Sequence, residues 1–290
     1  MEKTIIAVIC DFDGTLGPDM ISFLLEEQNI EPQGFWERIT EMVEGDGWDP
    51  AQAYMHQLLI HFQQRKIALT QELLRKTGSK LRLYPGIPEV FPALKKYIET
   101  DNKLKSIPLD LEYYIISGGL EEVILGTPVA DHVSGIFGCN FDYDKMTGAA
   151  CAVKRTISFT EKTKYIYAIN KGITADDIRK YPYRVNDFIE KDRRRIPFDR
   201  MIYIGDGPSD IPCMSMIKQN EGVGVGVSER GGTFDKGYEL ARGRRITVGP
   251  YSADYRKNSD MRKALHAILG AIGLKIGVEL RRHVVGAVKH

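Results

Sequence analysis

The chain has 290 residues, of which 43% are hydrophobic and 27% are charged, so it can bury a large core and general disorder is excluded. Its 40 Lys and Arg residues balance 39 Asp and Glu residues, which removes the electrostatic basis for a broad nucleic-acid-binding surface. We therefore expect two lobes and no nucleic-acid partner.

The cysteines and the first apolar run indicate the cellular compartment of the protein. None of the four cysteines forms a C-x-x-C pair of the kind that binds zinc or exchanges disulfides, so we expect buried free thiols. The run of residues 5–9 is too short to span a bilayer and lacks a signal-peptide cleavage site. The sequence therefore predicts a cytoplasmic protein with no membrane partner.

Residues 4–10 are rich in Ile and Val and apolar throughout, which is typical of a parallel strand covered on both faces. Helical patterns separate several later runs of the same kind. This alternation predicts an α/β fold with a Rossmann-like, doubly wound parallel sheet. The later strands are expected at 113–116, 136–139, 201–204, 223–227 and 246–248.

Residues 17–83 have helical periodicity and no strand pattern. An apolar stripe runs through residues 51–62, with Asp49 and Pro50 suited to the helix start, and a second helix is expected from Thr70 to Gly78. The sequence predicts a small all-helical cap domain at 17–83, inserted into a core domain of residues 1–16 and 84–290. Trp36, Trp48 and Tyr54 could line a pocket under this cap, but aromatic residues at helical spacing are most often core, which is our expectation for them.

Two later segments are less clearly patterned. Residues 142–148 read as a turn between two extended pieces, which favours a hairpin. Residues 264–288 are apolar enough to form a helix that packs either on the core or on a partner subunit. The sequence leaves a monomer and a homodimer equally open.

The segment Asp11-Phe12-Asp13-Gly14-Thr15 directly follows the first predicted strand. Open α/β sheets bind ligands at the carboxyl ends of their strands. Two carboxylates at i and i+2 of an extended chain project to the same side and repel each other unless a cation or a proton intervenes. A turn or helix cap would also explain this segment if it stood alone.

Three further segments could supply phosphate and metal ligands. Ser117-Gly118-Gly119 offers a hydroxyl and exposed amides after a predicted strand, and Gly205 to Asp210 offers Asp206 and Asp210 four residues apart. Oxygen ligands of this kind suit Mg²⁺. A lysine at 162 or 164, placed before a predicted helix at 165–170, could balance phosphate charge.

These four segments, in this order, resemble the motifs of the haloacid dehalogenase (HAD) superfamily, specifically its phosphoserine-phosphatase-like phosphatases with a helical C1 cap. The resemblance covers residues 5–248 and implies a magnesium-dependent phosphoric monoester hydrolase that forms an aspartyl-phosphate. It implies Asp11 as nucleophile, Asp13 as general acid and base, and Ser117 and Gly118 as phosphate ligands. Lys162 is preferred over Lys164 as the catalytic lysine, because Ile166 and Ile169 follow it at the family's offsets.

The resemblance also implies a metal shell of Asp11, the backbone carbonyl of Asp13, and Asp206, with Asp210 in or next to it. An acid at Asp13 favours phosphatase over dehalogenase chemistry, because an alkoxide leaving group needs a proton and a halide does not. The expected partner is a small phosphorylated metabolite. Two alternatives stay open: a phosphotransferase with the same intermediate, and a catalytically silent metabolite-binding protein.

Overall fold

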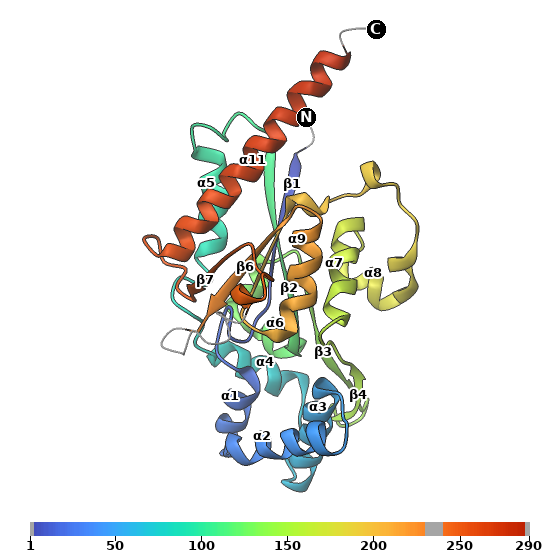
Figure 1. Ribbon diagram of the computed structural model, residues 1–290. Helices are drawn as coiled ribbons and strands as arrows, with labels where there is room; N and C mark the ends of the chain where they lie inside the picture. Colours follow the sequence, from blue (N-terminus) through green and yellow to red (C-terminus); the bar gives the residue numbers. More distant parts are fainter. Residues whose placement is uncertain (1–2, 230–239, 288–290) are drawn as a thin grey trace.

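The computed structural model describes residues 3–229 and 240–287, with side chains of the last helix described up to residue 281. A seven-stranded sheet forms the centre, in the order β4-β3-β2-β1-β5-β6-β7 (Figure 1). All neighbouring pairs are parallel except β3 and β4, which form the predicted hairpin. The strands are β1 (Thr4–Cys10), β2 (Leu109–Leu120), β3 (Gly135–Tyr143), β4 (Ala150–Arg155), β5 (Met201–Gly205), β6 (Val223–Ser228) and β7 (Val248–Ser252).

Helices cover both faces of the sheet. In Figure 1, α5 and α11 lie on one side of the strands and α7 and α9 on the other. This arrangement confirms the predicted doubly wound α/β fold, since parallel strands joined by helical crossovers are buried on both faces. The helices of this part are α5 (Val90–Thr100), α6 (Glu121–Gly126), α7 (Glu161–Lys171), α8 (Ala175–Lys180), α9 (Ile211–Gln219) and α11 (Asp260–Ala287).

The chain between β1 and α5 is helical and lies beyond the carboxyl ends of the strands (Figure 1). Its apolar stripe is buried, and Asp49 accepts a 3.0 Å hydrogen bond from the Ala51 amide at the start of α3, as an N-cap residue does. We call residues 17–83 the cap segment and retain its domain boundaries as a prediction. Its helices are α1 (Met20–Glu27), α2 (Pro32–Thr40), α3 (Pro50–Gln64) and α4 (Gln71–Lys80), with a π-helical turn at Glu41–Gly45.

α4 packs very closely on α6. A Cβ atom added at Gly78 would lie 1.9 Å from the Val123 carbonyl oxygen, and one added at Gly126 would lie 2.0 Å from the Arg75 carbonyl oxygen. The two backbones therefore touch where glycine is the only residue that fits.

The C-terminal segment packs on the core. Tyr97 of α5 stacks on His266 of α11 with ring centroids 4.1 Å apart, which is the first of the two packing arrangements left open by the sequence. Before this helix, Tyr255 donates a 2.9 Å hydrogen bond to the Thr15 carbonyl, and its amide donates to the Pro85 carbonyl at 2.7 Å. Tyr255 thus hydrogen-bonds to the chain just before and just after the cap segment.

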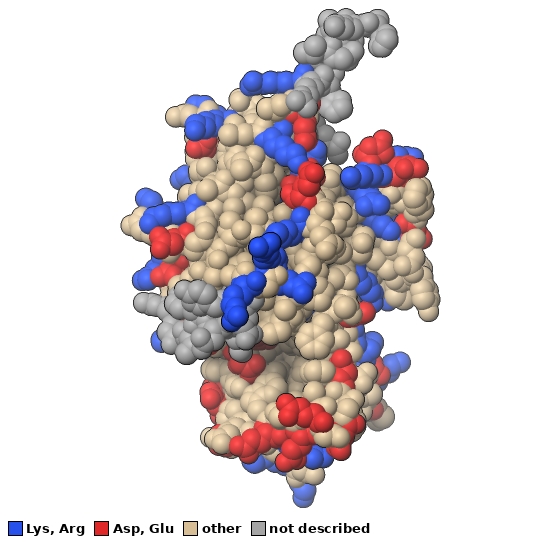
Figure 2. Space-filling model, in the orientation of Figure 1, with Lys and Arg blue, Asp and Glu red and all other residues tan. Residues whose placement is uncertain are grey.

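The face shown in Figure 2 has Lys, Arg, Asp and Glu interspersed on the core, whereas Asp and Glu gather on the cap segment below a hollow. Within the described residues, no helix combines the length and apolar character needed to cross a membrane.

Candidate active site

Asp11 lies just past β1 and is held in place by backbone and side-chain contacts. Its amide donates to the Ile204 carbonyl at 2.9 Å, continuing the β1–β5 pairing, and its Oδ1 accepts from the Phe12 amide at 2.7 Å. Its Oδ2 lies 2.8 Å from the Lys162 Nζ atom. The side chain is 5% exposed, so its orientation is fixed by the fold.

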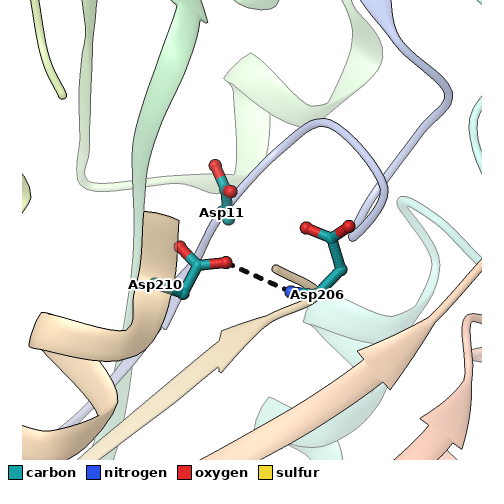
Figure 3. Close-up of side chains that lie close together, drawn as sticks. All are labelled: Asp11, Asp206 and Asp210. Atoms are coloured by element: carbon teal, nitrogen blue, oxygen red, sulfur yellow. Dashed lines mark hydrogen bonds between the residues drawn. The ribbon is translucent and has the colours of Figure 1, made fainter. Parts of the chain in front are cut away.

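Asp206 and Asp210 follow β5, the strand next to β1. Figure 3 shows their side chains gathered with Asp11, and one carboxylate oxygen of each of the three lies within 4.8 Å of the others. Gly14 has a φ of +72°, and a Cβ atom there would lie 2.3 Å from the Asp206 Oδ2 atom. The turn after Asp13 therefore requires glycine both for its backbone angle and to admit the Asp206 carboxylate.

Asp210 is completely buried and fully hydrogen-bonded. Its Oδ1 accepts from Lys162 Nζ and from the Tyr203 hydroxyl, both at 2.7 Å. Its Oδ2 accepts from the Asp206 and Gly207 amides at 3.2 and 3.3 Å, the first of which is drawn in Figure 3. Because an ionised carboxylate has about four acceptor positions, these four donors occupy all of them. Asp210 is therefore placed to hold Lys162 and the loop after β5.

The structure places Lys162, and not Lys164, beside Asp11. Lys162 is 1% exposed, and its ammonium contacts Asp11, Asp210 and, at 3.4 Å, the Ser209 hydroxyl. Lys164 instead pairs with Glu161 at 2.6 Å and is part-exposed. The sequence places Lys162 before its helix; the helix α7 begins one residue earlier, at Glu161, so Lys162 lies within the first turn.

The carboxylates of Asp11, Asp206 and Asp210 lie close enough to repel one another. Lys162 pairs with two of them, Asp11 and Asp210. Burial, followed by repulsion from Asp210, raises the pKa of Asp11 to about 7, although Lys162 opposes the shift. Burial alone would lower the pKa of Lys162, yet the neighbouring Asp11 and Asp210 carboxylates raise it, so the lysine stays charged.

Asp13 lies where the core meets the cap segment. Its Oδ1 accepts a 2.9 Å hydrogen bond from the Met20 amide at the start of α1, and a Cβ atom at Gly119 would lie 2.7 Å from its Oδ2. Burial and then the nearby Asp19 carboxylate raise the pKa of Asp13 well above its usual value. This shift favours the protonated form of the side chain.

Ser117 and Gly118 lie in an irregular part of β2. The sequence places them after their strand, but β2 runs to Leu120, with a register shift between Ile116 and Leu120. The Ser117 hydroxyl oxygen accepts from the Gly119 amide at 2.9 Å, and the serine is fully buried. Among the described residues, Gly118 lines the cavity described next and Ser117 does not.

A cavity of about 490 Å³ opens in front of these residues. Its walls come from the ends of β1, β2 and β5, from the start of α7, and from Asp19 and Tyr84 at the two ends of the cap segment. Asp11, Asp13, Gly118, Lys162 and Asp206 all line it. Each of the four predicted segments therefore places at least one site residue on this cavity, whereas Ser117 and Asp210 do not line it.

The donor set fits a divalent cation with a preference for oxygen. Asp11 and Asp206 place carboxylate oxygens within 4.8 Å of each other, and both line the same cavity. Mg²⁺ takes one or two carboxylates and completes its shell with water and phosphate oxygens. Asp11 and Asp206 are the residues that would hold such an ion.

Sequence reasoning missed several contacts of this region. Tyr54 of α3 donates a 2.7 Å hydrogen bond to the Gly118 carbonyl, a contact between residues 64 positions apart that no local pattern signals. Tyr203 and Ser209 contact the buried charges, and only their position beside Asp206 and Asp210 marks them. Trp48, expected in the core, is 36% exposed and stacks on His56.

Comparison with known proteins bears on the fold. No protein family profile matches the sequence. An uncharacterized protein of Borreliella burgdorferi is 27% identical over 240 residues, which are 74% of this chain and 79% of that protein.

Solved structures resemble the whole arrangement. A substrate-bound phosphoserine phosphatase superposes with a TM-score of 0.54 at 15% identity, covering 92% of this chain and 100% of the other. A probable phosphoserine phosphatase from Vibrio cholerae gives 0.52 at 12% identity over 95% of this chain and 67% of the other. A HAD family hydrolase from Salmonella enterica serovar Typhi gives 0.50 at 14% identity over 78% of this chain and 63% of the other, just under two thirds of its length. The chain has the fold of the HAD superfamily phosphatases, as its motifs predict.

Proposed function

We propose that this protein is a magnesium-dependent phosphatase that hydrolyses a small-molecule phosphomonoester through an aspartyl-phosphate on Asp11. The observation that supports it most is the convergence of Asp11, Asp206 and Lys162 on one cavity. Hydrolysis of phosphate monoesters is very slow without a catalyst, so a site for it must position the reactants and stabilise phosphoryl charge.

In the first step, an Asp11 carboxylate oxygen attacks phosphorus in line with the ester oxygen. The bond from phosphorus to that oxygen breaks, its electron pair stays on the oxygen, and Asp13 supplies the proton. The hydrogen bond from the Met20 amide fixes the Asp13 side chain while its other oxygen faces Gly119. The alcohol then leaves with Asp11 phosphorylated.

In the second step, water attacks the phosphorus of the aspartyl-phosphate and Asp13 takes its proton. Inorganic phosphate leaves, and Asp11 returns to a carboxylate. Lys162 keeps its charge through both steps because Asp11 and Asp210 surround it. Mg²⁺ bound by Asp11 and Asp206 would add positive charge that orients and neutralises the phosphoryl oxygens.

The remaining roles are proposed from the resemblance of the motifs. We propose the Gly118 amide and the Ser117 hydroxyl as phosphate donors, the Asp13 backbone carbonyl as a further metal ligand, and Asp210 as the residue that positions Lys162. A cytoplasmic location, a small phosphorylated metabolite as partner and a monomeric or homodimeric state belong to the same proposal.

The test is phosphate release from an aryl phosphate with Mg²⁺ or with EDTA. We expect release only with Mg²⁺, and a loss on the order of 10⁴-fold or more in Asp11→Asn, because removal of a nucleophile leaves only binding effects. Radiolabelled phosphate should be trapped on the wild-type protein by acid quench and not on Asp11→Asn. The matched control is Asp187→Asn, an exposed aspartate. Wild-type turnover in Asp11→Asn would overturn the proposal.

A further inference from the structure

A second cavity adjoins the site on the side of the cap segment. It has a volume of about 190 Å³, and it shares Gly118, Phe159, Lys162 and Ser209 with the cavity that holds the carboxylates. We call it the cap-side pocket. Its other walls come from α2, from the start of α3 and from the loop between β4 and α7, with Trp36, Ile39, Ala51, Tyr54 and Ile157 as the main apolar surfaces.

The cap-side pocket offers no counter-charge to a ligand. Among the described residues that line it, Lys162 alone is charged, and its ammonium is already held by Asp11 and Asp210. Serine hydroxyls at 158 and 209 are uncharged. A charged group placed there would lose its hydration without gaining an ion pair, which is unfavourable.

The two polar aromatic groups of the pocket already have partners within the protein. The Tyr54 hydroxyl donates to the Gly118 carbonyl at 2.7 Å, and the Trp36 indole nitrogen donates to the Ser22 hydroxyl at 2.8 Å. Both rings therefore present carbon surface, and their orientation is fixed before a ligand enters. Phe159 is 44% exposed and lines both cavities, so its ring adds solvent-exposed apolar surface where they meet.

The position of the pocket matches that of a leaving group. Asp11 approaches phosphorus from the end of β1, and in-line transfer puts the ester oxygen on the opposite side of phosphorus, away from the core. The cap segment supplies that side, with Tyr54 reaching across to the carbonyl of Gly118. An apolar cavity of about 150 Å³ in another protein holds benzene, so the cap-side pocket has room for one ring or a short branched chain.

We infer that the natural substrate is the phosphate monoester of an uncharged, apolar alcohol or phenol, whose organic group occupies the cap-side pocket. This inference rests on the proposed function and names its substrate class. An amino acid or amino alcohol phosphate is disfavoured, because its ammonium and carboxylate groups would meet Trp36, Ile39 and Ala51.

The test compares two alkyl phosphates, so that the leaving groups are both alkoxides. We expect kcat/KM for benzyl phosphate to exceed that for O-phosphoserine at least about 100-fold, and to rise about fourfold for each methylene group added along a short linear alkyl series, as expected for burial of apolar surface. Equal values, or a preference for phosphoserine, would overturn the inference while leaving the phosphatase proposal intact.

Two variants with matched controls locate the effect. Ala51→Leu fills the pocket, and we expect kcat/KM for benzyl phosphate to fall at least about tenfold while inhibition by inorganic phosphate changes less than twofold. Its control is Gln52→Leu, the exposed neighbour on α3.

Phe159→Ala should also lower kcat/KM for benzyl phosphate selectively, whereas Phe188→Ala, which removes an 82% exposed phenylalanine, should not. Equal effects of variant and control contradict the assignment.

A binding measurement separates this inference from the proposed function. Calorimetry with wild-type protein and Mg²⁺ should show benzylphosphonate binding at least about tenfold tighter than 2-amino-3-phosphonopropanoate. If no ester is hydrolysed but this preference is found, the phosphatase proposal fails and the pocket assignment stands. If binding shows no preference, the pocket assignment fails.

Discussion

Two groups of buried carboxylates follow the ends of neighbouring strands, and they differ in how their charge is balanced. Glu121 and Glu122, directly after β2, are 3% and 5% exposed. Glu121 pairs with Arg155 and, at 2.5 Å, with Arg179, while Glu122 pairs with Arg75 at 2.7 Å. Three guanidinium groups therefore face two carboxylates. This set, which we call the glutamate cluster, needs no added cation.

The site at the ends of β1 and β5 instead gathers the carboxylates of Asp11, Asp206 and Asp210 within 4.8 Å of one another, with Lys162 paired to Asp11 and Asp210. Carboxylates this close repel one another, so a cation bound among them would stabilise the arrangement. The comparison indicates that burial alone does not mark a functional site. What distinguishes the site is a set of closely spaced carboxylates beside a cavity.

Among variants that compare the two clusters, the largest effect should come from removing the Lys162 ammonium. Lys162→Met takes the lysine partner away from Asp11 and Asp210, and we expect kcat for an aryl phosphate to fall on the order of 10³-fold, with a loss of about 3 kcal/mol in unfolding free energy. Steady-state kinetics and urea denaturation measure both. Lys164→Met, two residues along the same helix, is the control and should change each value little. Equal activity of the two variants would remove Lys162 from the mechanism.

A divalent cation should stabilise the site and leave the glutamate cluster unaffected. At about 100 times its dissociation constant, Mg²⁺ should raise the unfolding free energy of the wild-type protein by about 2.7 kcal/mol, because it binds only the folded state. Thermal denaturation with Mg²⁺ or EDTA measures this shift. Asp206→Asn should lose most of it, and Glu121→Gln should keep it. A full shift in Asp206→Asn would place the metal elsewhere.

The glutamate cluster should matter for stability and not for turnover. Glu121→Gln weakens two charge-assisted hydrogen bonds, and we expect a loss of about 2 kcal/mol in unfolding free energy, with kcat within twofold of wild type. Its control is Glu161→Gln, whose exposed pair with Lys164 should contribute less than about 0.5 kcal/mol. A large fall in kcat for Glu121→Gln would mean that the two clusters are coupled.

The smallest effect should come from the one hydroxyl that joins the cap segment to Gly118. Tyr54→Phe removes its hydrogen bond and keeps the ring, so we expect kcat/KM to fall about fivefold, equivalent to about 1 kcal/mol. The Gly118 carbonyl also accepts from the Cys139 thiol at 3.1 Å, which limits the loss. An unchanged kcat/KM would show that this bond does not position the loop.

The parallel strands at the centre of the sheet were predictable because helices cover both of their faces, which leaves continuous apolar runs. The predicted strand at 113–116 is shorter than β2. The first four residues of β2, Leu109 to Glu112, alternate between buried and half-buried positions, so they do not form the continuous apolar run from which the strand was predicted. The prediction at 246–248 lies too early, because β7 continues through Gly249 and Pro250. Proline is tolerated there because β7 is an edge strand.

The carboxylates of the site were predictable because each follows a strand end, and strand order brings such ends together. Tyr54 and Phe159 were not, since their contacts depend on how the cap segment lies on the core and no motif records it. Glu121 and Glu122 carry no signal either. Two adjacent glutamates at a helix start read as solvent-exposed, and only the tertiary contacts with distant arginines explain their burial.

The glycine contact between α4 and α6 has a mechanical consequence. With Gly78 and Gly126 in backbone contact, sliding or tilting of α4 against α6 would break close packing along the whole crossing. An opening that keeps this contact would leave α4 in place and move α2 and α3, which form the cap-side wall of the pocket, relative to it. Substrate would then enter from the side of Trp36 and Tyr54, and the anchored helix would set the position to which the moving wall returns.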